Sequence, residues 1–138
     1  MLGGGNPVGG ANPSGTSRGL NHIGKHAFAN SGEVIVSNGT ETLFEFNSGS
    51  GYLVGSFTYG VDQNGQLGGG SLIGFTISFD GEKIMQMVAE TGQNFPIMDF
   101  DNNYVILIPP NTNVLIESET SSSGNVPTFG MISGEMFY

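Results

Sequence analysis

The stretch that decides the fold is Ile73-Gly74-Phe75-Thr76-Ile77-Ser78-Phe79-Asp80. Large apolar side chains alternate in it with small or polar ones, a period of two that is typical of a β-strand with one buried face. Asp80-Gly81 follows and is a strong signal for a tight hairpin turn. The segment after the turn, residues 84–88, is apolar on both faces. The sequence therefore predicts an antiparallel hairpin here.

The same signals continue on both sides of this hairpin. Segments 33–36 and 42–46 flank Asn38-Gly39, and this dipeptide predicts a second hairpin that joins them. Further strands are expected at residues 52–59, 104–108, 114–117 and 129–138. No stretch has a helical period. About eight short strands predict an all-β fold, either a β-sandwich or a jelly roll.

The N-terminal segment has a different composition. Residues 1–26 contain eight Gly, two Pro and no aromatic residue, and residues 1–32 contain no acid. Such a segment lacks the apolar area that would offset its ordering entropy. We therefore expect an extended arm over residues 1–32, with residues 1–26 disordered on their own, and a β body over residues 33–138.

The charge of the chain limits its partners. Only 11% of residues are charged and the net charge is −9, so binding to nucleic acid or to an anionic membrane is not expected. No apolar run approaches the roughly 20 residues that span a bilayer. Because few charges must be desolvated, the surface is inexpensive to bury against another protein.

The chain has no motif for catalysis. With no cysteine, no nucleophile next to a base and only two histidines, we expect neither an enzyme nor a bound cofactor or transition metal. His22 and His26 are four apart, but Gly24 between them disfavours a shared helix face. Asp99 and Asp101 would share one face of an extended segment and form a better candidate calcium site than residues 62–66, which lack the remaining spaced oxygens of a calcium loop. A turn before the next strand explains them equally well.

Three predicted strands, at residues 84–88, 104–108 and 129–138, are apolar on both faces. The second face needs a cover, which is either a long loop or another subunit. We favour the subunit interface and expect a homo-oligomer. The expected interface residues are Met85, Met87, Met131, Met136 and Tyr138.

The body resembles the small jelly-roll or β-sandwich proteins of virus capsids in residues 104–112 and in the closing Gly134-Glu135-Met136-Phe137-Tyr138. The polar, Gly-rich arm is similar to the arms by which capsid decoration (cement) proteins of tailed bacteriophages hold the shell. This resemblance implies a homotrimer on the capsid surface of a virion, assembled in the host cytoplasm. Its partner would be the major capsid protein or another shell subunit. Penton and fibre-tip proteins are similar nearly to the same degree.

Two further expectations depend on this interpretation. The arm residues expected to contact the shell are Arg18, Leu20, Ile23 and Lys25. The main alternative function is a carbohydrate- or receptor-binding module of a virion or cell surface, with a site around Asp99, Asp101 and Tyr104. An enzyme of the cupin type is disfavoured, because it needs several His on barrel strands and both His here precede the predicted body.

Overall fold

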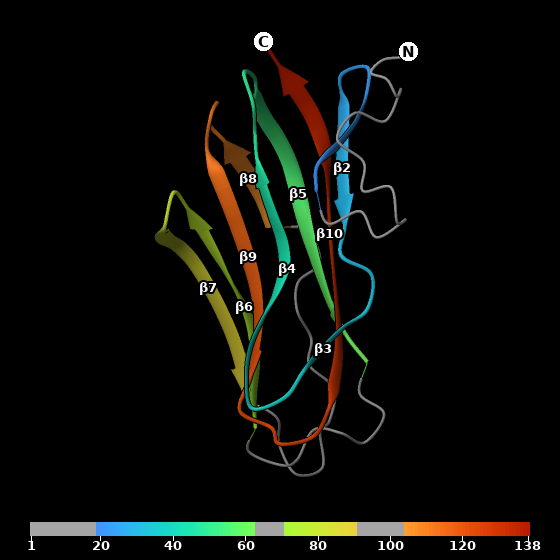
Figure 1. Cartoon of the computed structure of the whole chain (residues 1–138), viewed down its shortest axis with the longest axis vertical. Coiled ribbons are helices and arrows are strands. Elements are labelled where there is room, and N and C mark those ends of the chain that lie inside the picture. The colour runs from blue at the N-terminus through green and yellow to red at the C-terminus, as the bar shows by residue number, and fades with distance from the viewer. Residues whose placement is uncertain (1–18, 63–70, 91–103) are drawn as a thin grey trace.

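The computed structural model describes residues 19–62, 71–90 and 104–138, and these form ten strands and no helix. Two antiparallel sheets lie face to face as two layers (Figure 1). The predicted all-β sandwich is confirmed. The strands are β1 Asn21–Ile23, β2 His26–Asn30, β3 Val34–Val36, β4 Gly39–Asn47, β5 Tyr52–Val61, β6 Leu72–Phe79, β7 Glu82–Glu90, β8 Tyr104–Ile108, β9 Asn113–Thr120 and β10 Val126–Phe137.

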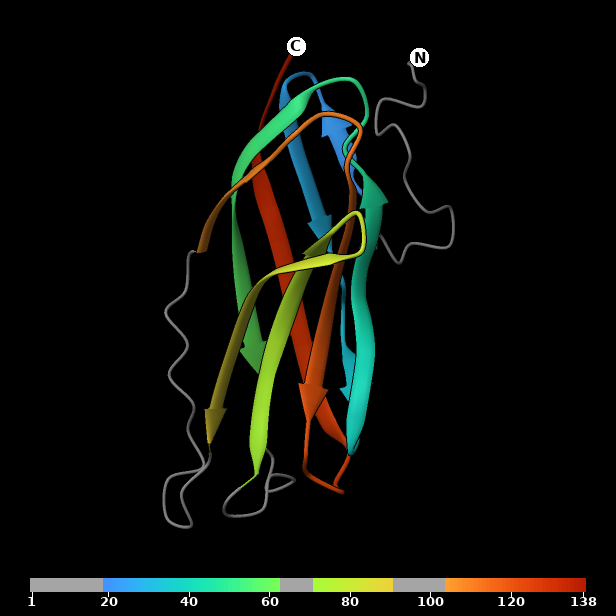
Figure 2. The ribbon, with the colours of Figure 1, turned by 90° about the vertical axis from the view of Figure 1, so that its left-hand side faces the viewer.

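The larger sheet has six strands in the order β1-β2-β10-β5-β8, with β3 also paired to β10. The smaller sheet has four strands in the order β4-β9-β6-β7, and Figure 2 shows it in front of the larger one. The longest strand, β10, pairs with β2 and β3 on one side and with β5 along ten residues on the other. It therefore organises the six-stranded sheet.

The hairpin predicted at Asp80-Gly81 is confirmed. β6 and β7 pair directly, and Phe79 lies opposite Glu82 across the turn. Asp80 and Gly81 have φ angles of 50° and 86°, the left-handed conformations that a type I′ turn needs at both central positions. Ile73, Phe75 and Ile77 on β6 are fully buried, as their alternation predicts.

The hairpin predicted at Asn38-Gly39 is wrong. β3 pairs with β10 in the larger sheet, whereas β4 pairs with β9 in the smaller sheet, so this dipeptide carries the chain from one sheet to the other. Asn38 has a positive φ of 38°, but Gly39 does not. The backbone N–H of Asn38 donates to Ser122 O at 2.6 Å. The turn is thus fixed by a contact distant in sequence, which the dipeptide alone does not reveal.

The predicted boundary between arm and body is also corrected. Residues 1–32 were expected to be an arm, but β1 and β2 belong to the six-stranded sheet, and β2 pairs with residues 131–135 of β10. Ala27 and Ala29 are fully buried, and Leu20 packs into the core at 6% exposure. The alternation in His26-Ala27-Phe28-Ala29-Asn30 is that of a strand. Its buried residues are small, so it carries little of the apolar signal on which the prediction relied.

Aromatic rings fill the space between the sheets. Phe57 of β5 meets Phe75 of β6 edge to face, with ring centroids 4.8 Å apart, so the two sheets touch directly at this pair. Phe44 of β4 also packs against Phe57, with ring centroids 6.2 Å apart. Such edge-to-face pairs add roughly 0.5–1.5 kcal/mol each beyond the area that they bury. The core therefore contains an aromatic cluster to which both sheets contribute.

Candidate functional surface

The outer face of the six-stranded sheet carries large apolar side chains that the described strands leave exposed. Side chains on this face come from alternate residues of β5, β8 and β10, because neighbouring residues in a strand point to opposite faces. We call this surface the apolar face. Its larger exposed side chains are Tyr52, Val54, Val105, Leu107, Phe129, Met131 and Phe137.

Strand register places these side chains in rows across the sheet. Tyr52 lies opposite Phe137, and the two rings stack with centroids 5.3 Å apart and an interplanar angle of 20°. In the next row Val54 lies between Leu107 and Glu135. The middle of the face then carries shorter side chains, such as Ser56 opposite Ser133, before Met131 and Phe129. The apolar side chains therefore form two groups on this face, one around Tyr52 and one around Met131, with the Ser133–Ser56 row between them.

The two outer faces of the sandwich differ in charge. Among the strand residues of the six-stranded sheet, Glu135 is the one acid on the apolar face, and it lies opposite His26 of β2. The outer face of the four-stranded sheet, which we call the acidic face, carries four carboxylates and Lys83. These carboxylates belong to Glu45, Glu90, Glu117 and Glu119. The two sides of the sandwich thus differ in their number of carboxylates, while exposed Leu72 and Val88 also lie on the acidic face.

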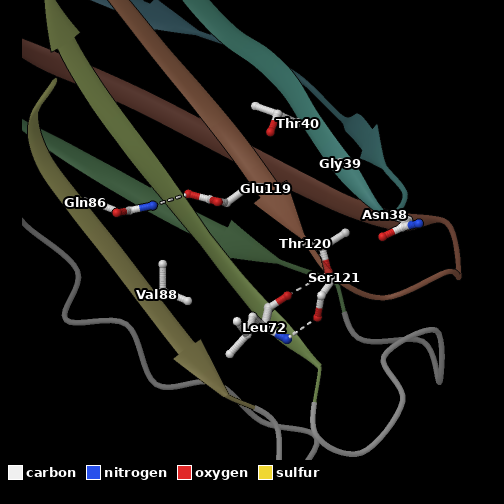
Figure 3. Close-up of a pocket in the computed structure, with 9 residues that line it drawn as sticks. All are labelled: Asn38, Gly39, Thr40, Leu72, Gln86, Val88, Glu119, Thr120 and Ser121. Carbon is white, nitrogen blue, oxygen red and sulfur yellow. Dashed lines mark hydrogen bonds between the residues drawn. The ribbon is translucent and has the colours of Figure 1, made fainter. Parts of the chain in front are cut away.

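The acidic face has a hollow of about 340 Å³, where β6, β7 and β9 meet the turn before β4 (Figure 3). Its floor carries the carboxylate of Glu119, which accepts hydrogen bonds from Thr76 Oγ1 at 3.0 Å and Gln86 Nε2 at 2.8 Å. Leu72 and Ser121 close one end, because the Leu72 N–H donates to Ser121 Oγ at 2.8 Å and the Ser121 N–H donates to Leu72 O at 3.0 Å. These polar groups already bond to one another.

The hollow is lined by one described carboxylate, that of Glu119. A carboxylate that works as a general acid or base in hydrolysis needs a second group at a matched distance and a site that excludes water. Glu119 is held by two neutral donors, the Thr76 hydroxyl and the Gln86 amide, in an open hollow. Among the described residues no cluster of three metal-ligating side chains exists.

The expected interface residues separate into different environments. Met131 lies on the apolar face at 47% exposure, and Tyr138 is exposed beyond the end of β10. Met136 is 1% exposed, because its side chain points into the core on the opposite face of the same strand. Met85 and Met87 lie on the inward side of the edge strand β7, opposite Ile77 and Phe75. The structure therefore does not bring the five residues together on one surface.

The expected arm contacts also separate. Leu20 is buried in the core, so it is not available to a partner. Ile23 and Lys25 are exposed at the β1–β2 hairpin, where Gly24 adopts a φ of 60° and the Met136 N–H donates to Lys25 O at 2.7 Å. Arg18 lies outside the described residues. The exposed part of the expected contact is therefore the tip of a hairpin anchored on β10.

Other candidate sites from the sequence resolve as follows. His22 lies opposite Ala27 and His26 lies opposite Ile23, so the two imidazoles point to opposite faces of one hairpin and cannot share a metal. Burial lowers the pKa of His22.

Tyr104 packs its ring against Phe75 at 5.2 Å and is half-buried, which does not suit a sugar platform. Asp99 and Asp101 lie outside the described residues.

Sequence reasoning missed most of the apolar face. Val54, Leu107, Phe129 and Phe137 were not selected as interface residues, although all four belong to predicted strands. The alternation of side chains along a strand could have identified them. In strand 129–138, residues separated from Met131 by an even number of positions share its face, whereas Met136 is five positions away and lies on the other face. Selecting residues by type, as methionines, mixed the two faces of the strand.

Comparison with protein-family models, with curated proteins and with solved structures finds no match to this chain. Within residues 19–62, 71–90 and 104–138, no helix has the length and apolar character that crossing a membrane would require.

Proposed function

We propose that this protein is a structural subunit of a virus particle, a decoration (cement) subunit that associates with its own copies and binds the capsid shell. The observation that carries the proposal is the apolar face, a sheet surface with one acid among its described residues. Large apolar side chains that gather on one exposed face of a small soluble protein mark interaction sites. A rigid β-sandwich with such a face is suited to assembly.

The oligomer that we propose is a trimer, as in the decoration proteins that the sequence resembles. Attachment to the major capsid protein, or to another shell subunit, would use the N-terminal region. Ile23 and Lys25 at the β1–β2 hairpin offer an apolar and a cationic contact, and Arg18 adds a second cation from the segment before the strands. Several arms in one oligomer would act together, because each attached arm raises the effective concentration of the others.

The test has two parts and uses particles from the cells that produce this protein. Mass spectrometry of purified particles should detect the chain in a fixed ratio to the major shell protein. Capsids stripped of the chain should rebind the purified full-length protein, and a variant that lacks residues 1–18 should rebind much more weakly. Absence of the chain from purified particles would contradict the proposed function.

A further inference from the structure

We propose that the apolar face is the surface on which a second copy of this chain packs. This inference deepens the proposed function and rests on the self-association that it includes. It assigns that contact to the six-stranded sheet, with Met131 of β10 and Leu107 of β8 inside it. The edge strand β7, to which Met85 and Met87 belong, lies outside the contact.

The area of the face is sufficient for a contact between two copies. A strand residue occupies about 16 Å² of sheet plane, given a rise of about 3.3 Å and a strand spacing of about 4.8 Å. The 27 residues of β5, β8 and β10 therefore span about 430 Å² before the relief of the side chains is counted. One partner in a standard interface buries about 800 Å². A second sheet packed face to face on these three strands would bury at least about half of that area.

Charge favours a second copy at this face over any other part of the described surface. Each chain carries a net charge of −9, so two copies repel one another wherever their carboxylates meet. On the acidic face, Glu117 and Glu119 of one copy would oppose the acids of the other. On the apolar face, Glu135 is the one acid among the strand residues, and His26 lies beside it. Two identical chains can approach there with the least desolvation of charge.

The test uses glutamate substitutions that leave the sandwich core untouched. Met131→Glu and Leu107→Glu each place a carboxylate on the apolar face, where the directly opposite side chains, Thr58 and Asn30 for Met131 and Val54 for Leu107, carry no charge. The matched control is Val88→Glu. Val88 is 42% exposed, close to the 47% of Met131, but it lies on the acidic face of β7, opposite Gly74.

We expect the two apolar-face variants to sediment at the monomer mass of 14.4 kDa under conditions where the unchanged chain is larger. Association should weaken by at least about tenfold, because a carboxylate without a partner in a closed interface is costly to desolvate. Val88→Glu should keep the mass of the unchanged protein. Far-UV circular dichroism and thermal unfolding of every variant would show whether the sandwich remains folded.

A second measurement tests the same contact without dissociating the oligomer. The chain contains no cysteine, so Met131→Cys and Val88→Cys each introduce one thiol. In the oligomer, a maleimide should modify Met131→Cys more slowly than Val88→Cys, and dilution should accelerate the first reaction alone.

The possible failures are distinguishable. If Met131→Glu and Leu107→Glu keep the mass of the unchanged oligomer, or if Val88→Glu alone dissociates it, the assignment of the face is wrong while self-association stands. Equal, dilution-independent labelling of the two thiols in an oligomer would also overturn the assignment. Absence of the chain from particles would instead remove the proposed viral role and leave the interface intact.

Discussion

Tyr59 joins the two sheets through a hydrogen bond in the core. Its hydroxyl lies 2.7 Å from Ser118 Oγ, and the two residues belong to β5 and β9, in opposite sheets. Burial raises the pKa of the Tyr59 phenol above its ordinary value of 10.0, although the hydrogen bond to Ser118 opposes this shift. The fold therefore favours the neutral phenol.

This shift predicts how stability changes at high pH. Because the pKa is higher in the folded state than in the unfolded state, the contribution is fully present below pH 10 and is lost as the pH rises above it. The free energy of unfolding should fall by up to about 1.4 kcal/mol per pH unit through this one group. The free energy of unfolding, measured by urea unfolding between pH 9 and pH 11, should fall less steeply with pH in Tyr59→Phe than in the unchanged protein. The control Tyr138→Phe, at an exposed site, should show the same dependence on pH as the unchanged protein. Parallel slopes for Tyr59→Phe and the unchanged protein would contradict this.

Gly130 leaves room for the aromatic core on β10. A methyl group at this position would lie 2.9 Å from Phe44 Cε2 and 3.1 Å from Phe57 Cε1. We expect Gly130→Ala to lower the free energy of unfolding by about 1–3 kcal/mol through overpacking. The control is Gly60→Ala on β5, where a methyl group would meet nothing within 4 Å. Chemical denaturation of both variants tests this, and equal effects would show that the ring cluster does not constrain Gly130.

At the scale of elements, two dipeptides with the same sequence signal have different roles. Asp80-Gly81 closes the β6–β7 hairpin with both residues at positive φ, whereas Asn38-Gly39 passes between the sheets with Gly39 in an ordinary conformation. Gly81→Ala should therefore lower the free energy of unfolding by about 1–2 kcal/mol, because the new Cβ is strained at φ 86°. Gly39→Ala should change it by less than about 0.5 kcal/mol. Thermal unfolding of the two variants tests this prediction. A larger loss of stability in Gly39→Ala than in Gly81→Ala would contradict the different roles given to the two dipeptides.

The β1–β2 hairpin gives an element-scale prediction about truncation. A chain that starts at Gly19 keeps every described strand, and we expect its melting temperature to match that of the full-length protein. A chain that starts at Ser31 loses β1 and β2, exposes the edge of β10 and removes buried Leu20, Ala27 and Ala29. It should melt at least about 10 °C lower, since several kcal/mol of packing are lost. Equal melting of the two truncated chains would show that the hairpin does not stabilise the sandwich.

The sequence predicted elements well where local pattern and tertiary contact agree. β6 and the turn into β7 follow from alternation and from turn chemistry, both of which are local. The path at Asn38 depends on Ser122, and the inclusion of β2 depends on its pairing with β10; neither is a local property. The apolar face was predicted only in part. The sequence predicts that strands 104–108 and 129–138 are apolar on both faces. Assigning each residue to the inner or the outer face requires the strand register, which is not a local property.

At the scale of the whole molecule, the sandwich is amphipathic. One outer face is apolar and nearly free of acid, the other carries four carboxylates, and the aromatic core between them belongs to both sheets. A monomer in water gains nothing from such asymmetry, whereas a subunit buries one side and keeps the other soluble. The proposed structural role rests on this difference between the two faces.

Sedimentation equilibrium of the unchanged full-length protein tests the central claim most directly. Across roughly 1–100 μM, a range chosen to bracket ordinary subunit affinities, we predict a mass that is a multiple of 14.4 kDa and, at the lowest concentrations, partial dissociation towards that value. A single species of 14.4 kDa at every concentration would contradict self-association, and with it the account of the apolar face as a surface between copies of this chain.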